Sequence, residues 1–102
     1  MDARRIETAA DPETLAAALP ATPPAGWQRT DNAGGIVEYR LPDDDGLCAA
    51  GKVTVRPDIL GDAAVRVDLA RGCQSAGTTY YDTVAAAAEG VAETLETAPE
   101  DP

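Results

Sequence analysis

Residues 52–69 read KVTVRPDILGDAAVRVDL, and this stretch decides the fold. Apolar and polar side chains alternate in both of its halves, which is typical of strands with one buried face. Pro57 ends the first half, and the turn-forming residues after it separate two antiparallel strands. We therefore expect strands at 47–56 and 63–71. The side chains expected to face the core are Val53, Val55, Val65, Val67 and Leu69.

Two further strands are expected upstream of this stretch. Residues 36–41 (IVEYRL) alternate in the same way and follow the turn-forming cluster NAGG at 32–35. A first strand is expected at 27–29, after a proline-rich link. Short connections favour antiparallel neighbours, so the sequence predicts a four-stranded antiparallel meander.

Helices are expected at both ends of the domain. Asp11 can cap a short N-terminal helix in which Pro12 takes the first position, and Pro20 prevents its continuation. From Thr79 the apolar period becomes helical, with one stripe formed by Tyr80, Val84, Ala87, Ala88, Val91 and Leu95. We therefore expect an α+β fold whose C-terminal helix packs on one face of the sheet. Its parts are a flexible N-terminus at 1–10, a single domain at 11–97 and a frayed tail at 98–102.

The charge balance excludes several functions. The chain has 18 acidic and 8 basic residues, a net charge of −10, and no histidine. Its field repels nucleic acid and anionic membranes, so neither is expected as a partner. The lack of histidine excludes Ser-His-Asp and Cys-His catalysis and imidazole metal sites. We expect binding rather than catalysis, with no catalytic residue, no metal and no cofactor.

Abundant Asp, Glu and Ala with a single lysine give a composition that resembles small acidic haloarchaeal proteins of unknown function. The resemblance covers the composition of the whole chain and rests on no motif. It implies a cytoplasmic protein at high salt, where ionic strength screens self-repulsion and strengthens apolar burial. Such support matters here because bulky aliphatic residues number only 17 of 102.

A basic cluster is expected on the outward face of the sheet. It holds half of the basic residues: Arg40, Lys52, Arg56 and Arg66. Glu38 and Asp68 lie among them, and a register with Lys52 opposite Asp68 would explain the cluster as cross-strand ion pairs. The alternative is a patch that binds an anion, a nucleotide phosphate or an acidic partner surface.

One match to a phosphate-binding loop is rejected. Residues 46–53 (GLCAAGKV) have its glycine and lysine spacing, but Val53 stands where Ser or Thr must bind magnesium. The true loop opens a helix, whereas the residues after Lys52 alternate as a strand. We expect a strand at this position.

The two cysteines are Cys48 and Cys73. The same register brings them near each other, which would allow a redox pair. Free cysteine usually behaves as a small core residue, and nothing basic adjoins Cys73 except Arg71. We therefore expect two buried, unreactive thiols.

These observations predict a small, non-enzymatic interaction or binding module. We expect a homodimer formed by edge pairing of the strand at 63–71, with an unknown protein or a small anionic ligand as a further partner. Two alternatives stay open. One is an anion- or nucleotide-binding domain that uses the basic outer face, and the other is a thiol-dependent redox or transfer enzyme that uses Cys48 or Cys73.

Overall fold

The computed structural model of the protein describes residues 9–42, 50–59 and 61–97. Strand formation follows the alternation of the sequence, and both helices follow their apolar spacing. The elements, in chain order, are α2 (Pro12–Ala18), β1 (Gln28–Asn32), the 3-10 turn η1 (Ala33–Gly35), β2 (Ile36–Leu41), β3 (Gly51–Pro57), β4 (Val65–Arg71), β5 (Gln74–Tyr81) and α3 (Val84–Thr97).

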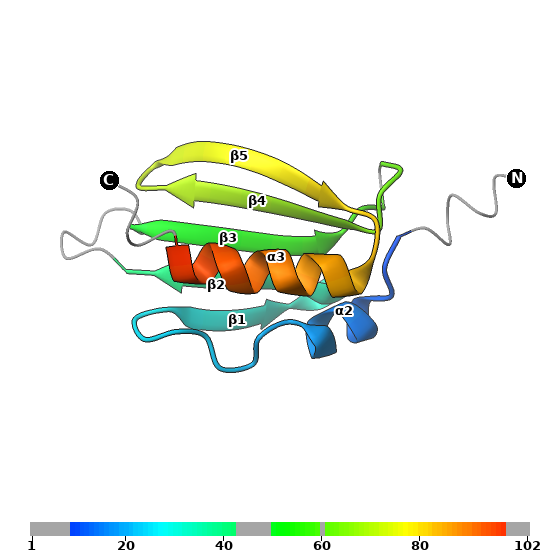
Figure 1. Cartoon of the computed structure of the whole chain (residues 1–102), viewed down its shortest axis with the longest axis horizontal. Helices are drawn as coiled ribbons and strands as arrows, with labels where there is room; N and C mark the ends of the chain where they lie inside the picture. Colours follow the sequence, from blue (N-terminus) through cyan, green and yellow to red (C-terminus); the bar gives the residue numbers. More distant parts are fainter. Residues whose placement is uncertain (1–8, 43–49, 60, 98–102) are drawn as a thin grey trace, which may run out of the picture.

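The strands form one antiparallel meander in the order β1-β2-β3-β4-β5. Both helices lie on one side of it, where α3 crosses in front of the sheet and α2 lies beside β1 (Figure 1). The α+β fold with a short N-terminal helix and a C-terminal helix on the sheet is confirmed. We call the sheet face turned away from the helices the outer face.

The sheet has one strand more than predicted. Residues 74–81, whose end we assigned to the C-terminal helix, form β5 instead. Their Thr and Tyr residues favour strands, and Gly72 has the positive φ of 60° that a tight reversal needs. The helix α3 begins at Val84, five residues after the predicted start at Thr79. At its start the hydroxyl of Thr83 accepts a hydrogen bond of 3.1 Å from the Ala86 amide. Tyr80 therefore lies on a strand and is 56% exposed.

The N-terminal helix forms as the sequence predicts. The Asp11 carboxylate accepts a hydrogen bond of 3.0 Å from the Thr14 amide and caps α2. Pro12 takes the first helical position, where its missing N–H leaves no donor unsatisfied. Leu15 and Leu19 then point into the core. The helix ends before Pro20, as expected.

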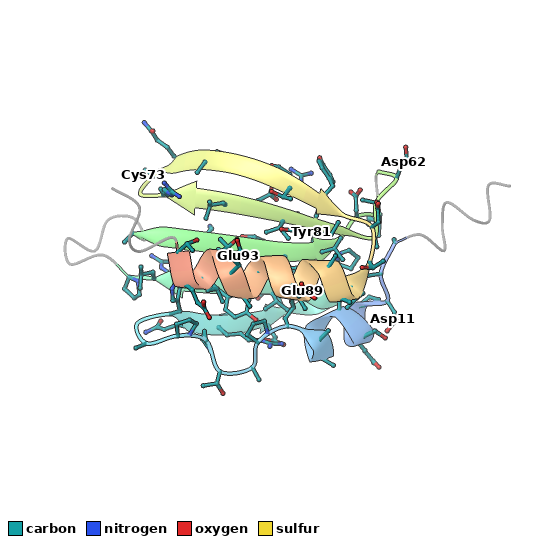
Figure 2. The ribbon with its side chains drawn as sticks, viewed as in Figure 1. Asp11, Asp62, Cys73, Tyr81, Glu89 and Glu93 are labelled. Atoms are coloured by element: carbon teal, nitrogen blue, oxygen red, sulfur yellow. The ribbon has the colours of Figure 1, made fainter. Side chains whose placement is uncertain are left out.

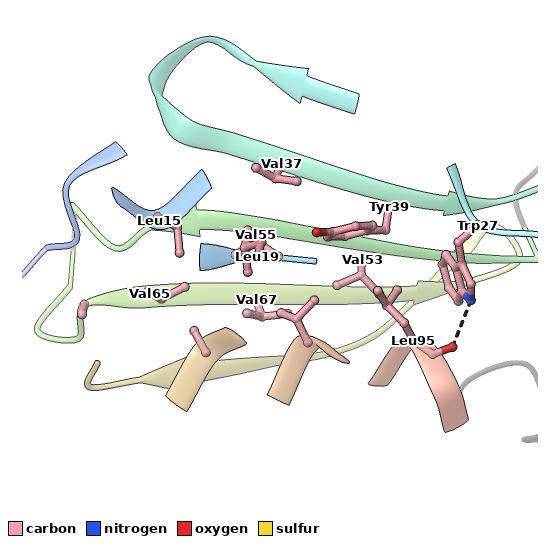
Figure 3. Packing of buried hydrophobic residues seen from close by; sticks show 13 residues of the cluster. Leu15, Leu19, Trp27, Val37, Tyr39, Val53, Val55, Val65, Val67 and Leu95 are labelled. Atoms are coloured by element: carbon pink, nitrogen blue, oxygen red, sulfur yellow. Dashed lines mark hydrogen bonds between the residues drawn. The ribbon is translucent and has the colours of Figure 1, made fainter. Parts of the chain in front are cut away.

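The core lies between the sheet and the two helices (Figure 3). The inward valines of β3 and β4 are buried, which confirms the predicted faces of both strands. The indole Nε1 of Trp27 donates a 3.0 Å hydrogen bond to the carbonyl of Leu95 and so ties the start of β1 to the end of α3. The buried cluster consists of Leu15, Leu19, Trp27, Val37, Tyr39, Val53, Val55, Ala64, Val65, Val67, Ala87, Val91 and Leu95.

The register of β3 and β4 differs by two residues from the one considered above. Lys52 lies opposite Ala70, and Asp68 lies opposite Thr54. A shift of two residues keeps every side chain on its predicted face, whereas a shift of one would invert the strand. The expected Lys52–Asp68 ion pair is therefore absent from the part of the chain that the structure describes.

Candidate functional site

The four predicted basic residues lie on the outer face in two cross-strand pairs. Arg40 of β2 is opposite Lys52 of β3, and Arg56 of β3 is opposite Arg66 of β4. The first pair is exposed and makes no ion pair with any described residue. The second pair lies four residues further along β3, about 13 Å at the usual rise of a strand. The outer face therefore has two separate basic ends.

The carboxylate of Asp68 forms ion pairs with both arginines of the second pair. Asp68 Oδ1 lies 3.2 Å from Arg66 Nε, and Asp68 Oδ2 lies 3.9 Å from Arg56 Nη2. The hydroxyl of Thr78 on β5 donates a 2.6 Å hydrogen bond to Asp68 Oδ1 and fixes its position. Two guanidinium groups and one carboxylate leave this group of residues with one positive charge in excess.

The Nε atom of Arg56 is buried and has no hydrogen-bond partner. Leaving a buried donor unsatisfied costs about 1–3 kcal/mol, and more for a charged group. The rest of the side chain is partly exposed, at 42%. The Nε–H of Arg56 is thus unused but buried, so an acceptor would reach it only after a movement of the side chain.

A cavity of about 440 Å³ adjoins the two arginines. Its walls come from the segment before α2, the turn η1, the end of β3 and the residues after it. Apolar groups form much of the lining, which consists of Ala10, Pro12, Gly34, Ile36, Arg56, Pro57, Asp58, Ile59 and Arg66. Ile59 is 76% exposed, so an apolar ligand part would cover surface that water now contacts.

A second cavity, of about 490 Å³, is also lined by Arg66. It is acidic, because Asp58, Asp62 and Asp82 line it together with Arg66 and Tyr80. Among the residues described, no group of three or more His, Cys, Asp or Glu side chains is placed to hold a metal ion. The acidic cavity therefore offers no metal centre built from described residues.

Asp58 lines both cavities and also makes a hydrogen bond within the β3–β4 connection. It is only 5% exposed, and its Oδ2 atom accepts a 3.2 Å hydrogen bond from the Ala63 amide. A β-carbon on Gly61 would collide with this carboxylate, so glycine is needed there. Asp58 thus holds the connection between β3 and β4, while its charge limits how much negative charge the adjoining cavities can accept.

Arg29 is a residue that the sequence reasoning missed. Its guanidinium donates to the carbonyls of Ala16, Leu19 and Pro20 at 2.8–3.2 Å and to both oxygens of Asp31. It thereby satisfies carbonyls at the C-terminal end of α2, which lack helical partners. The Nε and both Nη atoms all make hydrogen bonds, so this arginine connects α2 to β1 and leaves little for a ligand.

The Arg29 contacts shift neighbouring pKa values. The hydrogen bond with Asp31 raises the pKa of Arg29 and lowers that of Asp31. Burial raises the pKa of Tyr39, whose hydroxyl donates a 2.6 Å hydrogen bond to the Pro20 carbonyl. Arg29 and Asp31 are therefore both charged near neutral pH, while Tyr39 is neutral and donates its hydrogen bond.

Cys73 is disulfide-bonded and exposed, at the turn between β4 and β5 (Figure 2). The expectation of a buried free thiol is therefore wrong for Cys73. The chain's other cysteine, Cys48, lies outside the described residues. A thiol of Cys73 could act as a nucleophile only after reduction of this bond, so the thiol-dependent alternative gains no support from its position.

No protein-family model matches the chain, and neither a curated protein nor a solved structure matches it. No helix in the described ranges is long and apolar enough to cross a membrane.

Proposed function

We propose that the protein is a binding module that holds an anionic group between Arg56 and Arg66. The apolar part of the same ligand lies in the adjoining cavity, against Ile36 and Ile59. The observation that carries the proposal is the buried Arg56 Nε, which lacks a partner beside a cavity of about 440 Å³. That volume falls within the range of small-molecule sites.

The charge of the site favours a ligand with one negative charge. Asp68 offsets one of the two guanidinium groups, and Asp58 adds a nearby negative charge. With two arginines against these two carboxylates the site has no net charge, so it disfavours a phosphate dianion more strongly than a carboxylate with a single negative charge. Arginine also suits carboxylate oxygens because its planar fork can donate two parallel hydrogen bonds. The ligand class that fits is therefore an apolar carboxylate.

Isothermal titration with octanoate tests this function, with octanol as the uncharged match and inorganic phosphate as the more highly charged probe. We expect octanoate to bind more tightly than either. Arg56→Gln or Arg66→Gln should weaken octanoate binding about tenfold or more, because each removes a charge-assisted hydrogen bond worth about 1.5–3 kcal/mol. Circular dichroism of each variant checks that it remains folded.

Arg40→Gln is the matched control. It removes the same charge from the same outer face, but about 13 Å from the site. Octanoate affinity should be unchanged in this variant. Equal losses of affinity for all three arginine variants would mean that the overall charge of the outer face, and not a specific site, attracts octanoate. Equal affinity for octanoate and octanol would overturn the proposed role of the arginines.

The setting in which the module works is part of the same proposal. The net charge of −10 supports a protein adapted to high salt, and melting in low and molar potassium chloride tests this. A cytoplasmic location remains a prediction. The disulfide at Cys73 weighs against it, because disulfides persist mainly in oxidising compartments. Thiol labelling of the protein in its native cells tests the location: a labelled Cys73 indicates the reducing cytoplasm, and an unlabelled one indicates an oxidising compartment.

A further inference from the structure

β5 is an edge strand that pairs with β4 alone in the described sheet. One row of its backbone N–H and C=O groups therefore faces away from the sheet. Figure 1 shows β5 at the edge opposite β1, beyond the part of the sheet that α3 crosses. Seven of its eight residues are exposed. An edge of this kind is a template on which another strand can pair.

Most of the usual protections of an edge are missing from β5. Proteins block such edges with proline, charged side chains, bulges or very short strands. β5 (Gln74–Tyr81, QSAGTTYY) contains neither proline nor a charged residue, and it is the longest described strand. The one irregularity in its pairing lies near the β4–β5 turn, and the ladder is regular from Leu69↔Gly77 to Val65↔Tyr81.

The opposite edge is protected. β1 has five residues, and two of them are the charged Arg29 and Asp31. Their side chains form a 2.7 Å ion pair. The Asp31 side chain is 54% exposed, so a strand approaching β1 would meet its charge. Pairing is therefore directed to β5, and the dimer edge predicted at 63–71 is excluded because β4 lies between β3 and β5.

We propose that β5 pairs antiparallel with β5 of a second copy of this chain, which joins the two sheets across a two-fold axis. The distribution of charge favours this edge as the place where two copies meet. Two chains of net charge −10 repel each other, and among the five described strands β5 alone carries no charge. A two-fold contact places the same uncharged strand on both sides and closes without further growth.

This pairing would also cover Tyr80. Its side chain is on the outer face and is 56% exposed, one of two large apolar side chains exposed in the described ranges. Neighbouring strands lie about 5 Å apart, so residues of the second β5 would contact its ring. The backbone provides the pairing and this aromatic side chain provides apolar burial.

Salt should strengthen the dimer. Backbone hydrogen bonds at the edge do not depend on charge, whereas the repulsion between two acidic chains does. Because the Debye length falls from about 10 Å at 0.1 M to 3 Å at 1 M, added salt removes the repulsion and leaves the pairing. An ionic interface would show the opposite dependence.

Light scattering of the whole chain tests the proposal, with Thr79→Lys as the variant and Thr30→Lys as its matched control. Each places one lysine at an exposed threonine of an edge strand, Thr79 on β5 and Thr30 on β1. We expect the wild type and Thr30→Lys to approach twice the chain mass of 10.5 kDa as salt increases. Thr79→Lys should stay at the single-chain mass.

Three outcomes would overturn the inference: a wild type that remains a single chain at high concentration in molar salt, a dimer that survives Thr79→Lys, or a dimer that dissociates as salt increases. Amide hydrogen exchange provides a second measurement should Thr79→Lys fold poorly. In the wild type, amides of β5 that do not bond to β4 should become more protected as the protein concentration rises. Concentration-independent exchange there would contradict pairing at β5.

Discussion

Arg56 and Arg66 are directly opposite each other on β3 and β4, and the carboxylate of Asp68 approaches both guanidinium groups. Like charges in opposed positions destabilise a sheet. Asp68 lies on the same face of β4, two residues after Arg66, and its negative charge reduces this repulsion. The hydroxyl of Thr78 donates a hydrogen bond to its carboxylate. The sheet thus keeps two cations side by side next to a cavity, and among the described residues Asp68 forms the ion pairs with both of them.

Asp68→Asn should lower the stability of the fold and increase its affinity for octanoate. The variant loses the carboxylate that offsets Arg56 and Arg66, so the excess charge increases from one to two. Because these side chains are partly exposed, we expect a loss of about 0.2–1 kcal/mol, larger at low salt. Urea unfolding at two salt concentrations measures it. Glu38→Gln is the control on the same face, and a more stable Asp68→Asn would contradict the account.

Gly90→Ala should destabilise the protein, although Gly to Ala within a helix usually stabilises by about 1 kcal/mol. A β-carbon at residue 90 of α3 would collide with the ring and hydroxyl of Tyr81 on β5. In the Tyr81→Ala background the same substitution should become stabilising. Thermal unfolding of the four proteins in this cycle measures the change of sign. The same effect in both backgrounds would show that Tyr81 does not limit position 90.

Stability should fall in acid, in part through Asp31. Its hydrogen bond with Arg29 holds the pKa of this carboxyl below its ordinary value of 3.8, so the folded state binds fewer protons than the unfolded state. The contribution is present above the unfolded pKa and is lost as the pH falls through the folded pKa. Asp31→Asn should therefore lower stability at neutral pH and flatten its loss as the pH falls below the ordinary Asp pKa of 3.8. An unchanged acid slope would contradict this role.

Cys73→Ser should destabilise the fold in oxidising buffer. A disulfide limits the unfolded chain and typically contributes about 2–4 kcal/mol. Urea unfolding with and without a reducing agent measures this contribution. The reducing agent should lower the stability of the wild type and have no effect on the variant. Equal stability of the two proteins without the reducing agent would mean that the bond contributes nothing.

Alternation and capping made much of the fold predictable. Val53, Val55, Val65 and Val67 face the core as their period requires, and Asp11 caps α2 as its position requires. The fifth strand was missed because residues 74–81 have no alternating apolar period and are exposed on both faces, so the apolar Tyr80 fitted the stripe of a helix equally well. The β3–β4 register was missed because turn geometry sets it, and residues two apart share a face.

The candidate site was predicted only in part. Alternation alone placed Arg56 and Arg66 on the outer face, because side-chain direction has a period of two. The cavity beside them is formed in part by the segment before α2 and by the turn η1 that precedes β2. No local sequence pattern predicts contacts between segments so far apart in the chain. Arg29 shows the same limit. Its partners at Ala16, Leu19 and Pro20 are backbone carbonyls, which carry no sequence signal.

The Nε–Hε resonance of Arg56 provides the most direct test of the proposed binding site. Arginine side-chain NMR spectra would be recorded while octanoate is added, with octanol as the control. We expect the Arg56 signal to move and to become protected from exchange with water, because its unused N–H gains an acceptor. The signals of Arg40, at the other end of the face, should stay in place. An Arg56 signal that remains unchanged at octanoate saturation, or that moves equally with octanol, would contradict the account.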